Sequence, residues 1–198
     1  MTAVRQINAH SWEREPHEHY VEEHWCSRRL FELEPIEGTV WDPACGWGRI
    51  CDSALAAGHN IIYSDIVDRG YDPHGSKLVR DFLKSDWAVV DNIVTNPPFD
   101  LFEQFARHAL TLTRRKVAMI WLVRRLNAAR WLKQTPLRRI YLMSPRPSMP
   151  PGHVIARGEK PGGGTQDFCW LVWEHGFGGT AELGWLQRGA GRATDRNL

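Results

Sequence analysis

The chain has 198 residues, a formal net charge of +2, 42% apolar residues and 24% charged residues. This length suits one α/β domain with a substantial core, and the composition is that of a soluble globular protein. No apolar run is long enough to cross a bilayer, and the polar, charged N-terminus does not resemble a signal peptide. We therefore expect a cytoplasmic protein with one domain over residues 1–198 and flexible ends at 1–18 and 187–198.

Strand and helix signals alternate along the chain, which predicts a sheet with helices on its faces. Strands are expected at 39–44, 60–66, 77–83, 91–96, 116–123, 138–143 and 167–174. Helices are expected at 48–58, 100–113 and 124–134, the second capped by Asp100. Residues 144–166 form a long, basic loop rich in Pro and Gly, and such a loop is usually functional or disordered.

The four cysteines contain no C-x-x-C pair, so we expect reduced thiols that are mainly packed in the interior. The nine histidines include a loose N-terminal group, which a solvated, partly helical segment explains better than a metal site does. We expect no metal.

Positive charge is concentrated in the second half of the chain, from Arg114 onward, whereas residues 1–37 are rich in Glu. Such a basic half is either a solvated face or a surface for a polyanion, and the ten tryptophans include candidates for stacking on bases. The candidate nucleic-acid contacts are Arg124, Arg125, Arg130, Arg146, Arg157 and Lys160.

The stretch "DPACGWG", residues 42–48, combines the end of a strand, small residues and the start of a helix. This arrangement is typical of a nucleotide-type site at the carboxyl end of a parallel strand. Asp42 disfavours a phosphate at this position and favours a cationic ligand. The alternative is an ordinary Gly-rich turn between a strand and a helix.

Acidic residues follow the next two strands. Asp65 comes roughly 20 residues after the glycines, where a carboxylate accepts hydrogen bonds from ribose hydroxyls. Asp81 can accept from an adenine amino group, and Phe82 offers a backbone N–H and a packing face. Asp65 is also consistent with a strand-end cap. A lone Asp-Phe pair is a weak signal, and its value comes from its position relative to the other two motifs.

The stretch "NPPF", Asn96 to Phe99, follows the fourth expected strand. An aromatic amine is a weak nucleophile because its lone pair is delocalised, and two acceptors aimed at its hydrogens free that pair. The Asn96 side-chain oxygen and the Pro97 carbonyl can be these acceptors, and Pro97 and Pro98 hold the backbone rigid before substrate arrives. Phe99 supplies a face on which a flipped base can stack. The alternative is a plain Pro-Pro loop.

The series "DPACGWG", "YSDI", "RDFL" and "TNPPF" resembles class I S-adenosylmethionine-dependent methyltransferases of the amino-methylating type. It is most similar to the small N6-adenine DNA methyltransferases of phages and prophages, over roughly residues 20–186. The resemblance implies a Rossmann-like α/β fold with a seven-stranded, mostly parallel sheet whose last strand is antiparallel. It also implies S-adenosylmethionine as the cofactor.

The resemblance further implies roles for individual residues. Family members often begin with Tyr-x-Thr-Pro over the cofactor, whereas "HYVEEHW" provides Tyr20 and Trp25 without Thr-Pro. The implied cofactor contacts are Tyr20, Trp25, Asp42, Ala44, Cys45, Gly46, Asp65, Ile66, Asp81, Phe82 and Asn96. The implied target-base contacts are Asn96, Pro97, Pro98 and Phe99.

The predicted activity is methyl transfer to the N6 amine of adenine in DNA by direct in-line displacement. Three alternatives remain: methylation of adenine in RNA, methylation of glutamine amides in proteins, and a non-catalytic nucleic-acid-binding protein with the same fold. The basic second half favours nucleic acid over protein, and the complete set of motifs disfavours a non-catalytic protein.

Overall fold

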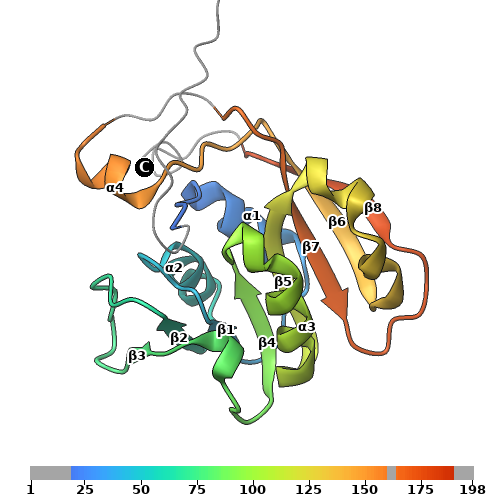
Figure 1. Ribbon diagram of the computed structural model, residues 1–198, viewed down its shortest axis with the longest axis horizontal. Helices are drawn as coiled ribbons and strands as arrows, with labels where there is room; N and C mark the ends of the chain where they lie inside the picture. Colours follow the sequence, from blue (N-terminus) through green and yellow to red (C-terminus); the bar gives the residue numbers. More distant parts are fainter. Residues whose placement is uncertain (1–18, 160–163, 190–198) are drawn as a thin grey trace, which may run out of the picture.

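The structure is a computed structural model that describes residues 19–159 and 164–189 (Figure 1). Residues 1–18 and 190–198, which contain most of the expected flexible ends, lie outside the described residues, as does Lys160. Gln187, the first residue of the expected flexible tail, is the last residue of a strand.

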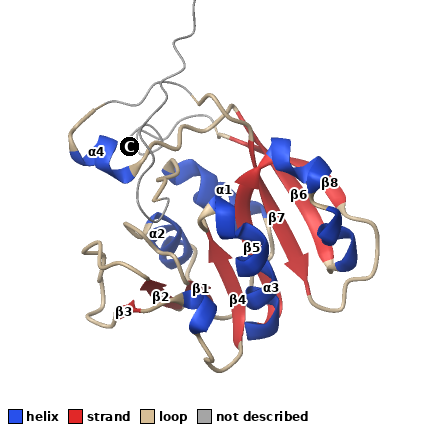
Figure 2. Cartoon of the chain, viewed as in Figure 1, coloured by secondary structure: helices blue, strands red, loops and turns tan. Residues whose placement is uncertain are grey.

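Within the described residues, eight strands form one sheet in the order β3-β2-β1-β4-β5-β7-β6-β8 (Figure 2). The strands are β1 (Val40–Asp42), β2 (Ile61–Asp65), β3 (Leu78–Val79), β4 (Val90–Thr95), β5 (Thr113–Leu122), β6 (Leu137–Ser144), β7 (Phe168–Glu174) and β8 (Glu182–Gln187). Every neighbouring pair is parallel except the two that involve β7, which is antiparallel to both β5 and β6. The expected mostly parallel sheet is therefore confirmed. It has one strand more than expected, because β8 adds a parallel edge beside β6.

The strands at the centre of the sheet are long apolar runs because both faces of the sheet are covered there. All seven residues from Lys116 to Leu122 of β5 are buried, and so are residues 168–173 of β7. Trp41, Trp170 and Trp173 are fully buried and form the centre of the core.

Four α-helices lie in the described part of the chain: α1 (His24–Leu33), α2 (Arg49–Ala56), α3 (Phe102–Leu112) and α4 (Gly152–Ala156). Helix α2 leads from β1 to β2, whereas α3 leads from β4 to β5 in the opposite direction along the sheet. Right-handed crossovers in opposite directions place the two helices on opposite faces and open a crevice between β1 and β4. None of the helices described is long and apolar enough to span a bilayer.

Two helix predictions were wrong in detail. Residues 124–134 are not an α-helix but two 3₁₀ helices, η4 (Val123–Ala128) and η5 (Arg130–Gln134), which Ala129 separates with a ψ of 63°. Asp100 does not cap α3. It lies within the 3₁₀ helix η3 (Phe99–Leu101), and its carboxylate pairs with Arg125 instead.

The strand expected at 77–83 is shorter than predicted. Strand β3 has two residues, and the 3₁₀ helix η2 (Phe82–Lys84) follows it. The reason is local, because the Asp81 side chain accepts a hydrogen bond from the backbone N–H of Leu83 and caps that helix.

The first described residues are joined to the loop between β6 and β7. Tyr20 forms a β-bridge with Pro151, the Val21 N–H donates to the Pro150 carbonyl over 3.0 Å, and the Gly152 N–H donates to the His19 carbonyl over 2.9 Å. The same loop carries α4, which lies beyond the end of the sheet toward which β4 points (Figure 1). These contacts give part of the expected irregular loop a defined structure.

Candidate active site

A cavity lies at the carboxyl ends of β1, β2 and β4, at the point where the strand order reverses. In open α/β sheets this is the position where ligands bind. The predicted site residues that line it are Tyr20, Asp42, Ala44, Cys45, Gly46, Asp65, Ile66, Asp81, Phe82, Asn96 and Pro98. Twelve further lining residues were not predicted as site residues from the sequence: His19, Val21, Glu22, Pro43, Trp47, Arg49, Ile50, Arg69, Leu83, Asp100, Leu101 and Phe105.

Three of the predicted cofactor and target-base contacts do not line the cavity. Trp25 is fully buried in the core, and its indole N–H donates to Glu23 over 2.8 Å. Pro97 is buried in the NPPF loop. The ring of Phe99 lies parallel to that of Tyr20, with centroids 5.9 Å apart and an interplanar angle of 6°.

The turn after β1 brings backbone close to the cavity. Gly46 has a φ of +52°, and a Cβ at this position would lie 2.8 Å from the His19 ring. The Gly46 N–H donates to the Asp65 carboxylate over 2.8 Å, and the other oxygen of Asp65 accepts from the Val67 N–H over 2.9 Å. The sequence placed the turn and Asp65 in the same site, and the structure joins them directly.

Buried ionisable side chains line the cavity. Asp42 is 2% exposed, and burial raises its pKa to about 8, with the carboxylates of Glu22 and Asp65 contributing to the shift. Two arginines, Arg49 and Arg69, line the same cavity, and burial lowers the pKa of Arg49. The site therefore offers both signs of charge, as a ligand with separate cationic and anionic groups requires.

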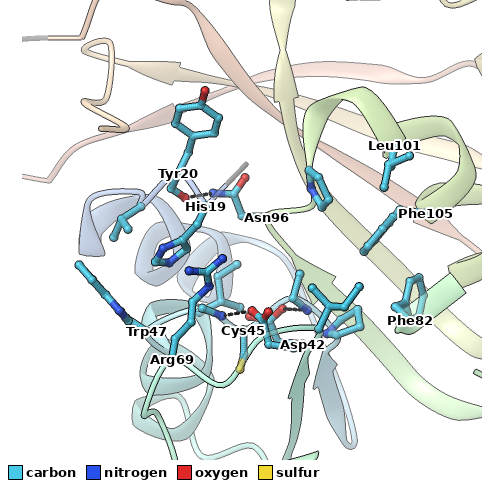
Figure 3. A pocket seen from close by; sticks show the side chains of 18 of the residues that line it. His19, Tyr20, Asp42, Cys45, Trp47, Arg69, Phe82, Asn96, Leu101 and Phe105 are labelled. Carbon is cyan, nitrogen blue, oxygen red and sulfur yellow. Dashed lines mark hydrogen bonds between the residues drawn. The ribbon is translucent and has the colours of Figure 1, made fainter. Parts of the chain in front are cut away.

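The opposite side of the cavity is apolar. Phe82, Leu101 and Phe105 lie together there, across the cavity from Trp47 and Arg69 (Figure 3). A flat aromatic ligand group fits between such side chains.

Asn96 stands at the rim, at the end of β4. Its side-chain NH₂ donates to the Tyr20 carbonyl over 2.9 Å and to the Glu22 carboxylate over 2.9 Å (Figure 3 shows the first of these bonds). Both partners are acceptors, so the nitrogen of the amide faces them and the oxygen faces away.

The basic residues predicted to contact nucleic acid differ in their surroundings. Arg125 is directed at the NPPF loop, where it donates to the Phe99 carbonyl over 2.7 Å and to the Asp100 carboxylate over 3.0 Å. Arg146 forms a bidentate pair with Asp167 at 2.6 and 3.1 Å. The remaining described members, Arg124, Arg130 and Arg157, are exposed.

Glu22 had only a weak signal in the sequence. It occupies the position at which the resembled family has Thr after Tyr-x, but its contact with Asn96 spans 74 residues. Arg69, likewise, is a lone basic residue in a loop, and no local pattern marks it as part of a cavity.

No protein-family model matches the chain, and no curated protein sequence matches it. Several solved structures align with it. A protein from Pyrococcus horikoshii that is described as an RNA methyltransferase aligns with a TM-score of 0.58 and 17% identity, covering 75% of this chain and 81% of that one. A predicted O-methyltransferase from Agrobacterium tumefaciens aligns with a TM-score of 0.57 and 13% identity, covering 83% and 85%.

A third structure, the magnesium protoporphyrin IX methyltransferase of Synechocystis with bound S-adenosylmethionine, aligns with a TM-score of 0.50 and 14% identity, covering 74% of this chain and 76% of that one. The protein thus has the class I methyltransferase fold. Because these neighbours are described as methyltransferases of different kinds, the substrate of this chain has to be argued from its own site.

Proposed function

We propose that the protein transfers a methyl group from S-adenosylmethionine to the N6 amine of adenine in DNA. The observation that carries this proposal is the position of Asn96. Its amide stands at the rim of the cavity that holds the predicted cofactor contacts, with the nitrogen engaged by two acceptors and the oxygen left to accept from an amine.

The residues of the cavity fit S-adenosylmethionine. Asp65 and Asp81 line the cavity and are the proposed acceptors for the ribose hydroxyls and the adenine amine, and the apolar side around Phe82 suits the adenine ring. The buried carboxylate of Asp42 suits the cationic methionine end, and an arginine such as Arg69 suits its carboxylate. When bound, this cofactor supplies a methyl group already activated on a sulfonium.

The NPPF loop is the proposed binding element for the target base. The Asn96 oxygen and the Pro97 carbonyl accept from the two hydrogens of the amine and so localise its lone pair for attack. Phe99 is the proposed stacking partner of the flipped base; its ring is 8% exposed and stacked on that of Tyr20, so the base would have to displace the Tyr20 ring to stack on it. Arg125 holds the Phe99 carbonyl and so supports the conformation of this loop.

The topology supports a basic surface next to the same rim. Strand β7 is antiparallel to both β5 and β6, so β5 and β6 run in the same direction as β4. Arg124 follows the carboxyl end of β5, and Arg146 follows that of β6. Both arginines therefore follow strands whose carboxyl ends lie on the same side of the sheet as Asn96. Arg124 is exposed there and is a proposed phosphate contact, whereas Arg146 would have to leave its pair with Asp167 to bind a phosphate.

Adenine in RNA is the second candidate substrate, and the Pyrococcus horikoshii neighbour favours it. The proposed contacts of the NPPF loop are to a base and not to a sugar, so they are compatible with either nucleic acid. Methylation of glutamine amides in proteins and a non-catalytic role are alternatives that the test below distinguishes.

The test is incorporation of tritiated methyl from S-adenosylmethionine into duplex DNA, single-stranded DNA, RNA and a protein extract. We expect label in DNA at N6 of adenine, with modified adenines also found when genomic DNA of an expressing host is sequenced. Asn96→Ala should lower the rate about 10²–10³-fold with cofactor affinity largely intact, because only the amine loses an acceptor. Label found only in RNA or only in protein would show that DNA is not the substrate. Near wild-type transfer by Asn96→Ala would overturn the proposed mechanism.

A further inference from the structure

Two neighbouring carboxylates in the first described segment have different surroundings. Glu22 is 5% exposed, lines the cavity and accepts a hydrogen bond from the Asn96 side chain over 2.9 Å. Glu23 does not line the cavity. It accepts from the Trp25 indole and pairs with Arg188 at 3.4 Å. Of these two carboxylates, Glu22 is therefore the one in contact with the NPPF loop.

The Glu22 carboxylate is an unusual group to bury. Burial raises its pKa, and the Asn96 hydrogen bond and the charge of Arg49 partly offset that effect. A buried carboxylate is costly unless hydrogen bonds satisfy it. The neighbouring Asp42 is a second acidic group, whose pKa the charge of Glu22 helps to raise, and it gives Glu22 no compensating positive charge.

An asparagine amide has two ends of similar shape, and a half-turn about its last torsion exchanges them. With the oxygen outward, Asn96 can accept from a substrate amine. With the nitrogen outward, the Asn96 NH₂, a donor, would face the N–H groups of the substrate amine, which are also donors. The Tyr20 carbonyl and the Glu22 carboxylate both select the first orientation, and Glu22 is the one of the two that a substitution can remove.

We propose that Glu22 is a positioning residue for methyl transfer, which holds the NH₂ of Asn96 and so keeps the amide oxygen directed at the substrate amine. This inference rests on the proposed function. It assigns the glutamate a role in the rate of the chemical step without contact with the transferred methyl group.

The first test compares Glu22→Leu, Glu22→Gln and the matched control Glu23→Gln in single-turnover methylation of DNA, with cofactor affinity measured separately. Loss of a hydrogen bond to a charged acceptor should slow the step by roughly 10- to 100-fold in Glu22→Leu. Glu22→Gln should be slowed less, because its amide oxygen can still accept from Asn96. The KM for DNA should change little, and Glu23→Gln should match the wild type. A wild-type single-turnover rate in Glu22→Leu would overturn the proposal.

A rescue experiment separates positioning from general disruption of the fold. In Asn96→Asp, two carboxylates face each other, and the rate should fall. Adding Glu22→Gln to Asn96→Asp supplies an NH₂ that donates to the new carboxylate, so the double variant should be faster than Asn96→Asp alone. Glu22→Gln would then slow the otherwise wild-type enzyme and accelerate the Asn96→Asp variant. A double-variant rate equal to the product of the two single effects would show no coupling and overturn the proposal.

A spectroscopic measurement works even if no methyl transfer is found, and so distinguishes failure of this inference from failure of the proposed function. The side-chain NH₂ signals of Asn96 in a ¹H–¹⁵N spectrum can be assigned by their loss in Asn96→Asp. They should shift in Glu22→Gln and remain unchanged in Glu23→Gln. Unchanged signals in Glu22→Gln would overturn the contact itself, whatever the substrate.

Discussion

The backbone N–H of Gly46 donates to the carboxylate of Asp65 over 2.8 Å. The bond ties the turn after β1 to the end of β2, so the two parts of the proposed cofactor site hold each other in place. With Val67 on its second oxygen, the Asp65 carboxylate is oriented before any ligand arrives. Lone pairs remain on both oxygens to accept from ribose hydroxyls.

We expect Asp65→Ala to weaken S-adenosylmethionine binding in calorimetry, by on the order of 1.5–3 kcal/mol for each hydrogen bond lost to the charged acceptor. NAD should not bind either protein. Asp68→Ala is the matched control, because that aspartate is exposed and pairs with Lys77. Unchanged affinity in Asp65→Ala would remove this residue from the cofactor site.

Cofactor affinity should depend on pH through Asp42, whose pKa burial raises to about 8. Below that pH the free protein holds a proton on this carboxyl, and a cationic ligand favours the ionised form. Binding should therefore release a proton, and affinity should rise with pH by up to about tenfold per unit until it levels off near pH 8.

Calorimetry in buffers of different ionisation enthalpy measures that proton directly. 5′-Methylthioadenosine, which lacks the charged methionine end, should show little pH dependence, and Asp42→Asn should abolish the dependence for S-adenosylmethionine. An affinity for S-adenosylmethionine that is constant below about pH 8 would mean that Asp42 does not face the cationic end.

Arg125 and Arg124 are adjacent arginines with different contacts, and their substitutions should separate loop support from phosphate binding. Arg125→Ala loses the hydrogen bond to the Phe99 carbonyl, worth about 1.5–3 kcal/mol, and should slow single-turnover methylation without changing the salt dependence of DNA binding. Arg124→Ala should leave that rate intact and reduce the slope of log K against log salt by ~0.9. The opposite pattern would make Arg125 the phosphate contact.

The loop between β6 and β7 is the second part of the proposed DNA surface. Replacing Arg146, Arg157 and Lys160 together by Ala should flatten the salt slope by about two to three units, while methylation of a free adenine nucleoside stays unaffected. Since Asp167 pairs with Arg146, Asp167→Asn should free that arginine and tighten DNA binding. A triple variant with the wild-type slope would place the DNA along Arg124, Arg125 and Arg130.

The local parts of the site could be predicted from the sequence. Asp42, Asp65 and Asn96 each follow an apolar run, and parallel strands bring their carboxyl ends to one edge of a sheet. The contact between Glu22 and Asn96 could not be predicted in this way. It depends on the pairing of residues 19–21 with 150–152, a long-range contact without a periodic pattern.

The misjudged elements have similar causes. Strand β8 was missed; it lies at the edge of the sheet, where its apolar residues Leu183 and Trp185 are exposed and Leu186 is buried. Residues 124–134 do form helical turns, but the turns are 3₁₀ and the backbone at Ala129 divides the segment. Tertiary context overrides local propensity in both places.

The position of β7 has a consequence for how the protein forms. β7 is the seventh strand in the chain, yet it lies between β5 and β6, so neither of them can complete its pairing until the connection of residues 145–167 has closed. Closing such a loop is an entropic cost met before its contacts are gained, and non-local pairing of this kind slows folding. A nascent chain synthesised only as far as β6 leaves the apolar edge of β5 unpaired, and open edges promote aggregation. The segment that we propose to contact DNA therefore also sets how long the growing chain stays exposed to that hazard.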